Sequence, residues 1–314
     1  MCTAACFKEK DFYFGRTLDY ETSYGEEIVV LPRNAKFDFF YEGKAENNYA
    51  IIGTAHVAGG YPLFYDAANE CGLCMAGLNF VGNAKYNSFR ENTKNAAQYE
   101  FLPWVLRQCK NVSEARRLIE NTNITDKAFD ENLPAAQLHW LVADKNSAIT
   151  VEATKSGMNI YDNPAGVLAN NPPFPVQMFS LNDYAALSVK QPENTFSPDL
   201  KLETYSRGMG ALGLPGDWSS KSRFIRAAFV RANSVSGGDE QSSVSRLFHI
   251  LGAVTQVKGC CDVGGKPEYT IYTSCINADK GVYYYKTYDS LSVASVDMSK
   301  ENLDGEELLR FRMV

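Results

Sequence analysis

The chain has no stretch of about 18 or more apolar residues, so we expect no membrane-spanning helix and no membrane partner. It also has no basic run, and its 31 Lys and Arg against 37 Asp and Glu give a net charge of −6. An acidic balance of this kind argues against nucleic acid as a partner. The first residues do not combine a basic segment with a long apolar one, so we expect no secretory signal and a cytoplasmic location.

Several common catalytic and binding motifs are absent as well. The histidines are His56, His139 and His249, and no Gly-x-Ser-x-Gly segment accompanies them, which argues against a Ser-His-Asp hydrolase. We interpret His139 and His249 as structural residues. No complete glycine-rich phosphate loop is present, so a nucleotide cofactor is not expected.

The chain has eight cysteines, but their spacing does not indicate disulfides or metal ligands. Because the chain is large and we expect no export, reduced thiols are the better interpretation. Cys71 and Cys74 have the spacing of a redox pair, yet they lie before a predicted strand rather than opening a helix. Cys260 and Cys261 have no second ligand pair nearby, so we expect no zinc site.

Strand patterns and helix patterns occur in separate groups along the chain. The predicted strands are Thr3–Lys8, Phe12–Tyr20, Glu27–Leu31, Phe37–Tyr41, Ala50–Thr54, Gly72–Asn79, Leu138–Ala143, Ala148–Ala153, Tyr269–Cys275, Val282–Tyr288 and Leu291–Asp297. The predicted helices are Glu100–Cys109, one capped by Asn111 with Glu114 completing a capping box, Arg223–Asn233 and Ser243–Val254, the last two preceded by serines that can cap them. This grouping favours an α+β fold in which helices cover sheet faces. No linker or repeat divides the chain, so we expect one domain over residues 1–314.

The most informative residue is Cys2, which directly follows Met1. Removal of Met1 is expected because the next side chain is small, and the mature chain is then 2–314. Cys2 would carry both a thiol and a free α-amine, whose usual pKa values are about 8.5 and about 7.7–8.0. The amine can accept the thiol proton near neutral pH, so nucleophile and base come from one residue and no histidine is needed.

The first two predicted strands form a hairpin that brings charged residues to Cys2. A turn near Glu9–Asp11 places Cys2 opposite Thr17 and beside Arg16, whose positive charge would favour the thiolate. Asp19 falls just past the end of the pair, where it could hold the α-amine or orient the nucleophile. A surface salt bridge on a hairpin is the alternative interpretation of these two charged residues.

Short motifs are spread over nearly the whole chain. In order, they are Met1-Cys2-Thr3, Phe14–Tyr20, Pro32–Asn34, Asn69–Leu73, Ala76–Phe80, Leu168–Phe174, Gly213–Asp217, Ser222–Phe229 and Tyr283–Asp289. Together they resemble the choloylglycine hydrolase family, which contains bile salt hydrolases and penicillin V acylases. The resemblance implies an N-terminal nucleophile hydrolase with a four-layer αββα sandwich, in which two stacked, mainly antiparallel sheets lie between helix layers. It also implies a homotetramer.

The resemblance further implies roles for individual residues. The catalytic set would be Cys2, Arg16, Asp19, Asn79, Asn170 and Arg223. Cys2 would be the nucleophile, tuned and oriented by Arg16 and Asp19. Asn79 and Asn170 would bind the oxygen of the tetrahedral intermediate, and Arg223 would hold the charge network of the site. The reaction would be acyl transfer through a thioester, which requires no metal and no organic cofactor.

The same resemblance indicates the substrate. An asparagine at position 79 resembles bile salt hydrolases, whereas penicillin V acylases more often carry tyrosine there. A steroid needs a broad apolar pocket. Candidate wall residues of this pocket are Leu18, Tyr24 and the loop Tyr61–Phe64, in which Phe64 is the selected residue. For each of them an ordinary core position is the alternative interpretation.

One further segment, Ser206-Arg207-Gly208, resembles a loop associated with taurine conjugates. Arg207 could pair with a sulfonate through charge-assisted hydrogen bonds, and a lone exposed arginine is the alternative. Conjugated bile salts are therefore the expected substrates, with penicillin V or an N-acyl homoserine lactone as alternatives. A protein that binds bile acids without cleaving them is the alternative from another class.

Overall fold

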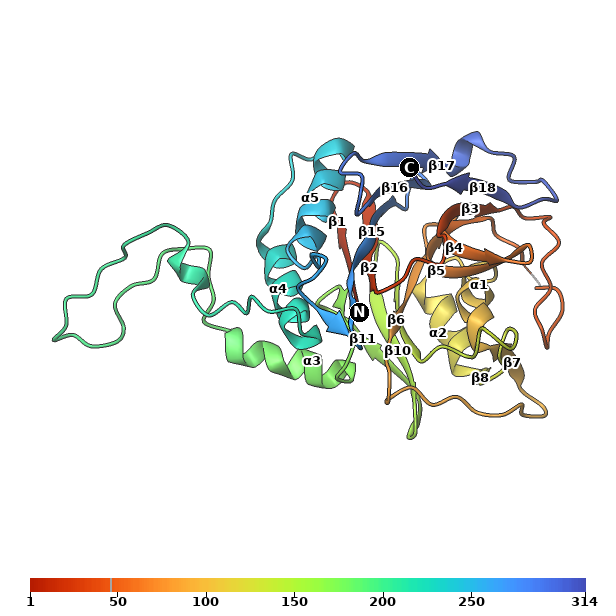
Figure 1. Ribbon diagram of the computed structural model, residues 1–314, viewed down its shortest axis with the longest axis horizontal. Helices are drawn as coiled ribbons and strands as arrows, with labels where there is room; N and C mark the ends of the chain where they lie inside the picture. The colour runs from red at the N-terminus through yellow and green to blue at the C-terminus, as the bar shows by residue number, and fades with distance from the viewer. Residues whose placement is uncertain (46) are drawn as a thin grey trace.

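The computed structural model describes residues 1–45 and 47–314, and within them two stacked β-sheets form the middle of the molecule (Figure 1). Helices α4 (Ser220–Asn233) and α5 (Glu240–Gly252) cover the outer face of one sheet. Helices α1 (Phe101–Leu106) and α2 (Val112–Glu120) lie on the outer side of the other. This is the predicted αββα sandwich, and the fold class is confirmed.

The first sheet contains the N-terminal strand. Its strand order is β12-β1-β2-β15-β16-β17, and neighbouring strands are antiparallel. The strands are β1 (Cys2–Lys8), β2 (Phe12–Tyr20), β12 (Val167–Leu168), β15 (Tyr269–Asn277), β16 (Val282–Thr287) and β17 (Ala294–Asp297). Strand β1 therefore lies between β2 and the segment that leads to Asn170.

The second sheet has the order β11-β10-β9-β6-β5-β4-β3-β18, also antiparallel. Its strands are β3 (Glu27–Leu31), β4 (Ile51–Ala58), β5 (Tyr61–Asn69), β6 (Cys74–Asn79), β9 (Leu138–Ala143), β10 (Ala148–Thr154), β11 (Gly157–Asp162) and β18 (Leu309–Arg312). Strand β6 ends at Asn79, so the sheet delivers this residue to the same region as Cys2.

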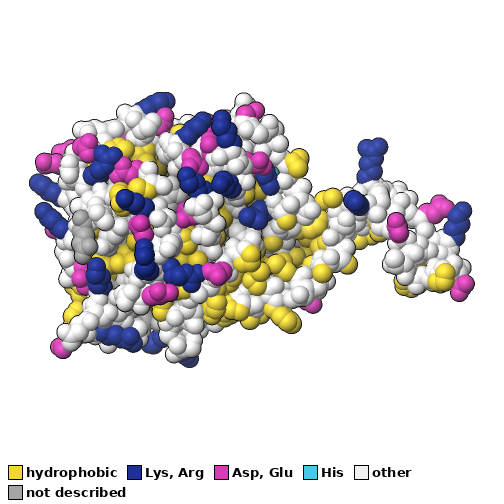
Figure 2. Space-filling view, turned by 180° about the vertical axis from the view of Figure 1, so that it is seen from behind, with side chains coloured by type: hydrophobic (Ala, Val, Ile, Leu, Met, Phe, Trp, Pro, Cys, Tyr) yellow, Lys and Arg dark blue, Asp and Glu magenta, His cyan; other side chains and the backbone are white. Residues whose placement is uncertain are grey.

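The remaining elements are short. They are helix α3 (Phe174–Ser180), the parallel pair β7 (Lys94–Ala97) and β8 (Thr122–Thr125), the pair β13 (Asp262–Val263) and β14 (Lys266–Pro267), and 3₁₀ turns at Gln98–Glu100, Leu181–Tyr184, Met209–Ala211 and Met298–Lys300. The segment between α3 and α4 protrudes far from the sandwich (Figure 1). Hydrophobic side chains gather at its base (Figure 2).

Strand β3 shows why both sheet faces are apolar. Successive side chains of a strand point to opposite faces. Ile28 and Val30 belong to the core between the sheets, whereas Val29 and Leu31 belong to the core that contains Trp104 of α1. A sheet that is buried on both faces needs apolar residues at consecutive positions.

No helix in the described part of the chain has the length and apolar character that a membrane crossing needs.

One predicted strand and one predicted loop were wrong. Phe37–Tyr41 is not a strand, because Phe39 pairs only with Gly43 across a tight turn while the side chains of Phe37 and Phe39 pack on α1 and its neighbours. Conversely, Tyr61–Phe64 is not a loop but the start of β5. Pro62 suppressed that prediction, and it is tolerated here because it lies near the first residue of the strand.

The helix caps agree only in part with the predictions. The Asn111 Oδ1 atom accepts the Glu114 N–H over 2.9 Å, as predicted, but Glu114 Oε2 accepts the N–H of Lys110 rather than that of Asn111. Helix α5 is capped by Asp239 and not by a serine. Ser219 precedes α4 without forming a side-chain cap.

The register of the N-terminal hairpin differs by one residue from the prediction. Cys2 lies opposite Leu18, not Thr17, because the turn has a three-residue loop closed by the Glu9 N–H donating to the Asp11 carbonyl over 3.0 Å. A one-residue shift moves every side chain to the other face. Cys2, Arg16 and Leu18 therefore share the face toward the second sheet.

Candidate active site

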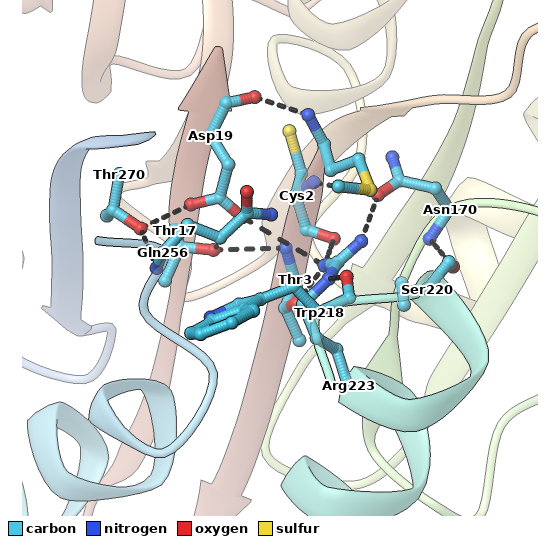
Figure 3. Close-up of polar contacts among 12 residues, drawn as sticks. Cys2, Thr3, Thr17, Asp19, Asn170, Trp218, Ser220, Arg223, Gln256 and Thr270 are labelled. Carbon is cyan, nitrogen blue, oxygen red and sulfur yellow. Dashed lines mark hydrogen bonds and ion pairs between the residues drawn. The ribbon is translucent and has the colours of Figure 1, made fainter. Parts of the chain in front are cut away.

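Cys2 is the first residue of β1, and its side chain is buried at the end of the core between the sheets. Its backbone N–H donates to Asn170 Oδ1 over 2.7 Å, and its carbonyl accepts from Arg223 Nη1 over 2.5 Å (Figure 3). Asn170 follows β12, and Arg223 lies in α4. Segments far apart in the sequence therefore fix the backbone on both sides of the Cys2 side chain.

Asn170 connects four parts of the site. Its Oδ1 also accepts from Arg223 Nη2 over 2.7 Å, and its Nδ2 donates to the Asn79 carbonyl over 2.8 Å. Its backbone N–H donates to Ser220 Oγ over 2.7 Å. Because Oδ1 faces two donors and Nδ2 faces an acceptor, the amide has one satisfactory orientation.

Arg223 and Asp19 form a buried pair behind Cys2, with Nη1 and Oδ2 3.9 Å apart. Asp19 accepts from the hydroxyls of Thr17 (3.0 Å) and Thr270 (2.6 Å), and Arg223 donates to Thr3 Oγ1 over 2.5 Å. Burial lowers the pKa of Arg223, and the negative charge of Asp19 offsets part of that shift. The acid and its hydroxyl partners thus compensate a guanidinium with no access to solvent.

The N-terminal ammonium of Met1 lies beside this pair. It donates to the Asp19 carbonyl over 2.5 Å and to Glu268 Oε1 over 2.6 Å, and the Met1 carbonyl accepts the Asp19 N–H over 2.9 Å. Cys2 is joined to Met1 by a peptide bond here. Thr17 lies inside the Phe14–Tyr20 motif, but no role was predicted for it, and no local sequence pattern around Glu268 or Thr270 marks a site.

Arg16 lies on the other side of Cys2, and only 1% of it is exposed. Its Nη1 donates to the carbonyls of Gly77 (2.6 Å) and Tyr65 (3.1 Å), while Nη2 has no protein partner in residues 1–45 and 47–314. Burial by itself lowers the pKa of Arg16, but the acidic groups around it, with Cys2 foremost, outweigh burial and raise it above the usual range. A permanent cation with a spare donor therefore lies beside Cys2 in the wall of the same cavity.

The carboxyl group of Asp66 lies at the interface between the sheets, where its negative charge favours the positive charge of Arg16. It accepts hydrogen bonds from the hydroxyls of Tyr272 (2.5 Å), Tyr283 (2.7 Å) and Ser274 (2.9 Å). The Ser274 hydroxyl in turn accepts the Arg16 N–H over 3.1 Å. Burial raises the pKa of Asp66, and the charge of Arg16 opposes that shift.

A cavity of about 430 Å³ opens at Cys2. Its wall includes Arg16 and Asn79 and many apolar or aromatic side chains. The predicted wall residues Leu18, Tyr24 and Phe64 line it, and so does Leu63 of the predicted Tyr61–Phe64 segment, whereas Tyr61 and Pro62 do not. Further lining residues that no sequence pattern marked are Tyr20, His56, Tyr99, Phe129 and Leu133. The cavity thus joins one thiol and a few polar groups to a broad apolar surface.

The structure brings the six predicted catalytic residues to one end of this cavity or directly behind it. Arg207 is different, because it is exposed in the protruding segment and does not line the cavity of its own chain. All eight cysteines lie in the described part of the chain, and each is a free thiol. The described residues contain no cluster of three or more His, Cys, Asp or Glu that could hold a metal ion.

The sandwich of two antiparallel sheets between helix layers, with a cysteine at the start of an inner strand, is the architecture of N-terminal nucleophile hydrolases. Residues 2–311 match the family of linear amide C–N hydrolases, the choloylglycine hydrolase family. The chain is 50% identical to a bile salt hydrolase/transferase of Lactiplantibacillus plantarum over 99% of its length and 96% of that protein. It is 38% identical to a bile salt hydrolase/transferase of Clostridium perfringens over 99% of its length and 97% of that protein.

Solved structures agree. A crystal structure of a mutant conjugated bile acid hydrolase from Clostridium perfringens superposes with a TM-score of 0.92 at 37% identity, covering 100% of this chain and 97% of that one. A penicillin V acylase from Agrobacterium tumefaciens shares the fold, with a TM-score of 0.76 at 19% identity over 99% of this chain and 91% of that one. The chain belongs to the choloylglycine hydrolase family, as its motifs indicated, and is a hydrolase of linear amide carbon–nitrogen bonds.

Proposed function

We propose that this enzyme hydrolyses the amide bond of glycine- or taurine-conjugated bile salts through a thioester on Cys2. The observation that supports this most is the position of Cys2 at the wall of an apolar cavity of about 430 Å³. Pockets of roughly 300–1,000 Å³ suit compact organic ligands, and a steroid presents a large apolar body to such a wall. The names of relatives that are 38–50% identical support the same substrate class.

The acylation step needs the free α-amine that removal of Met1 exposes on Cys2. The thiol proton passes to this amine, and the thiolate attacks the carbonyl carbon of the substrate amide. The carbon–nitrogen bond breaks, and the proton on the α-amine leaves with the nitrogen of glycine or taurine. The bile acid stays bound to Cys2 as a thioester.

The deacylation step reverses these proton movements. Water gives a proton to the α-amine as its oxygen attacks the thioester carbonyl. The carbon–sulfur bond breaks, the sulfur recovers the proton, and the free bile acid leaves. In both steps negative charge develops on the carbonyl oxygen, and Asn170 Nδ2 together with Asn79 would stabilise it, since they meet beside Cys2.

The cationic residues have separate roles in this proposal. Arg16 would stabilise the thiolate from the cavity side, where its Nη2 has no protein partner among the described residues. Arg223 would hold Asn170 and the Cys2 backbone in place, and Asp19 would keep Arg223 compensated.

Comparison of substrates tests the proposal. Purified enzyme whose mass shows that Met1 is absent should release taurine or glycine from taurocholate and glycocholate faster than it cleaves penicillin V. Cleavage of penicillin V alone, or of an N-acyl homoserine lactone alone, would keep the thiol mechanism and move the substrate class. Binding of taurocholate without amine release would contradict the proposal.

Arg207 carries a finer hypothesis, a preference for taurine conjugates. It does not line the cavity of its own chain, so contact with a substrate would require the protruding segment to reach a neighbouring copy in the implied homotetramer. The R207A variant should lower kcat/KM for taurocholate about 3–10-fold more than for glycocholate, because both conjugates are anionic and only the difference between their charge-assisted hydrogen bonds, about 0.7–1.4 kcal/mol, changes the ratio. K201A, which removes another exposed cation from the same segment, is the control. An unchanged taurine-to-glycine ratio in R207A would remove the hypothesis.

A further inference from the structure

His139 on β9 and Glu152 on β10 form a polar pair in the fully buried part of the second sheet. Both side chains are 0% exposed, and His139 Nδ1 lies 3.0 Å from Glu152 Oε1. The other ring nitrogen, Nε2, lies 2.7 Å from the carbonyl oxygen of Ala169. Neither residue lines the cavity, so the proposed chemical steps do not use them.

The partners fix where the protons are. A carbonyl oxygen can only accept, so His139 Nε2 carries a proton and donates it to Ala169. Two lone pairs cannot face each other at 3.0 Å, so a second proton lies between Nδ1 and Glu152 Oε1. Oε1 also accepts the Phe174 N–H over 2.9 Å, so this one oxygen contacts both the imidazole and the start of α3, while Oε2 has no hydrogen-bond partner among the described residues.

The pair contacts the segments that carry both asparagines of the site. Ala169, which accepts from His139, directly precedes Asn170. The His139 ring stacks on Phe80, with centroids 4.3 Å apart and planes at 6°, and Phe80 directly follows Asn79. These two asparagines come from different sheets, and the Nδ2-to-carbonyl contact between them spans the gap.

We infer that the His139–Glu152 pair positions Asn79 and Asn170 relative to Cys2 and thereby sets the geometry of oxyanion stabilisation. This inference rests on the proposed acyl-transfer function. One imidazole holds the Asn170 segment by a hydrogen bond and the Asn79 segment by stacking, while Glu152 holds the start of α3 through the Phe174 N–H. A shift of about 1 Å at a reacting centre can cost on the order of 10² in rate, so such an indirect anchor matters for turnover.

The E152Q variant tests the pair with almost no change of volume. If the amide oxygen occupies the Oε1 position, it still accepts the Phe174 N–H but offers His139 Nδ1 neither a negative charge nor an acidic proton, so the bond to the ring weakens. If the amide nitrogen occupies it, the Phe174 N–H faces another donor. Either way one anchor weakens, and we expect kcat to fall about 10–100-fold while KM stays within about twofold.

Two measurements separate positioning from loss of structure. Alkylation of Cys2 by iodoacetamide measures the reactivity of the thiol in a reaction that forms no oxyanion. The rate of this alkylation in E152Q should stay within about twofold of the rate in the parent. D144N is the matched control, because Asp144 is a buried carboxylate just past the other end of β9 that accepts three backbone N–H groups away from the site. D144N should lose thermal stability with kcat within about twofold of the parent.

F80L is the second variant and decides the matter if E152Q does not fold. It removes the stacking on His139 and keeps an apolar side chain, and we expect kcat to fall about 3–10-fold with unchanged alkylation. The kcat of each variant is compared with that of the parent on whichever conjugate or acyl amide the parent enzyme cleaves. If the proposed substrate class is wrong, the parent enzyme itself fails to cleave bile salt conjugates, and the comparison of variants with the parent still holds. Unchanged kcat in folded E152Q and F80L, or an equal loss of kcat and of Cys2 alkylation, would overturn the inference.

Discussion

Replacement of Cys2 by alanine or serine is expected to lower kcat for amide cleavage by about 10⁴–10⁶-fold. In the proposed mechanism Cys2 is the covalent nucleophile, so its removal abolishes the route through an acyl-enzyme, and what remains is binding and oxyanion stabilisation. Serine keeps a hydroxyl at the same place, but its proton is far harder to remove, so C2S should be as inactive as C2A. Release of taurine or glycine from conjugates, followed with time, measures the effect.

C6A is the matched control for this experiment. Cys6 lies on the same strand as Cys2 and is also buried, but it does not line the cavity. Burial raises the pKa of the Cys6 thiol to about 11, so it stays protonated near neutral pH and is a poor nucleophile. C6A should keep kcat within about twofold of the parent. Amine release by C2A at the parental rate would show that Cys2 is not the nucleophile.

The second large effect is expected at Asn170. N170A removes the donor that points at Asn79 and the acceptor for Cys2 and Arg223, and should lower kcat about 10²–10³-fold. This variant alone cannot separate a donor to the oxyanion from a structural support of Arg223.

N170D makes that separation. Aspartate has nearly the same shape and can still accept from the Cys2 N–H and from Arg223, but it has no Nδ2 donor. We expect kcat of N170D to fall at least as far as that of N170A, because the oxygen in place of Nδ2 faces the Asn79 carbonyl oxygen and cannot donate. If kcat of N170D remains within about threefold of the parent, the donor role of Asn170 is wrong and its acceptor bonds are what matters.

Much of the sheet framework was predictable from local patterns. The bounds of Phe12–Tyr20, Glu27–Leu31 and Leu138–Ala143 agree with the structure because dense β-branched and aromatic runs end at turn residues there. The strand at Tyr61–Asn69 was missed because Pro62 and Asp66 break the pattern. Asp66 is tolerated inside the sandwich because three hydroxyls from the other sheet donate to it, and no local pattern contains those partners.

The register of the N-terminal hairpin could not be predicted from local sequence patterns. Both of its strands were predicted, yet the register was not, since a turn with a two-residue loop and one with a three-residue loop have almost the same sequence pattern. His139 was interpreted as an ordinary structural residue. Its sequence neighbours give no reason to expect Glu152, Ala169 and Phe80 around it. Pairing of β9 with β10 brings Glu152 close, and pairing of β9 with β6 brings Phe80 close.

The sequence by itself determined the position of the cysteine behind Met1, the family of amide hydrolases and the residues that carry its motifs. These follow from residue identity and order along the chain. Only the tertiary structure decided that Cys2, Arg16 and Leu18 share one face, that Asn79 and Asn170 meet beside Cys2, and that Arg207 lies outside its own cavity. The physical reason is that the first of these facts depends on strand register and the second on hydrogen bonds between residues 91 and 168 positions apart, and such contacts form only when the two sheets stack. The position of Arg207 depends on the path of the segment that protrudes from the sandwich.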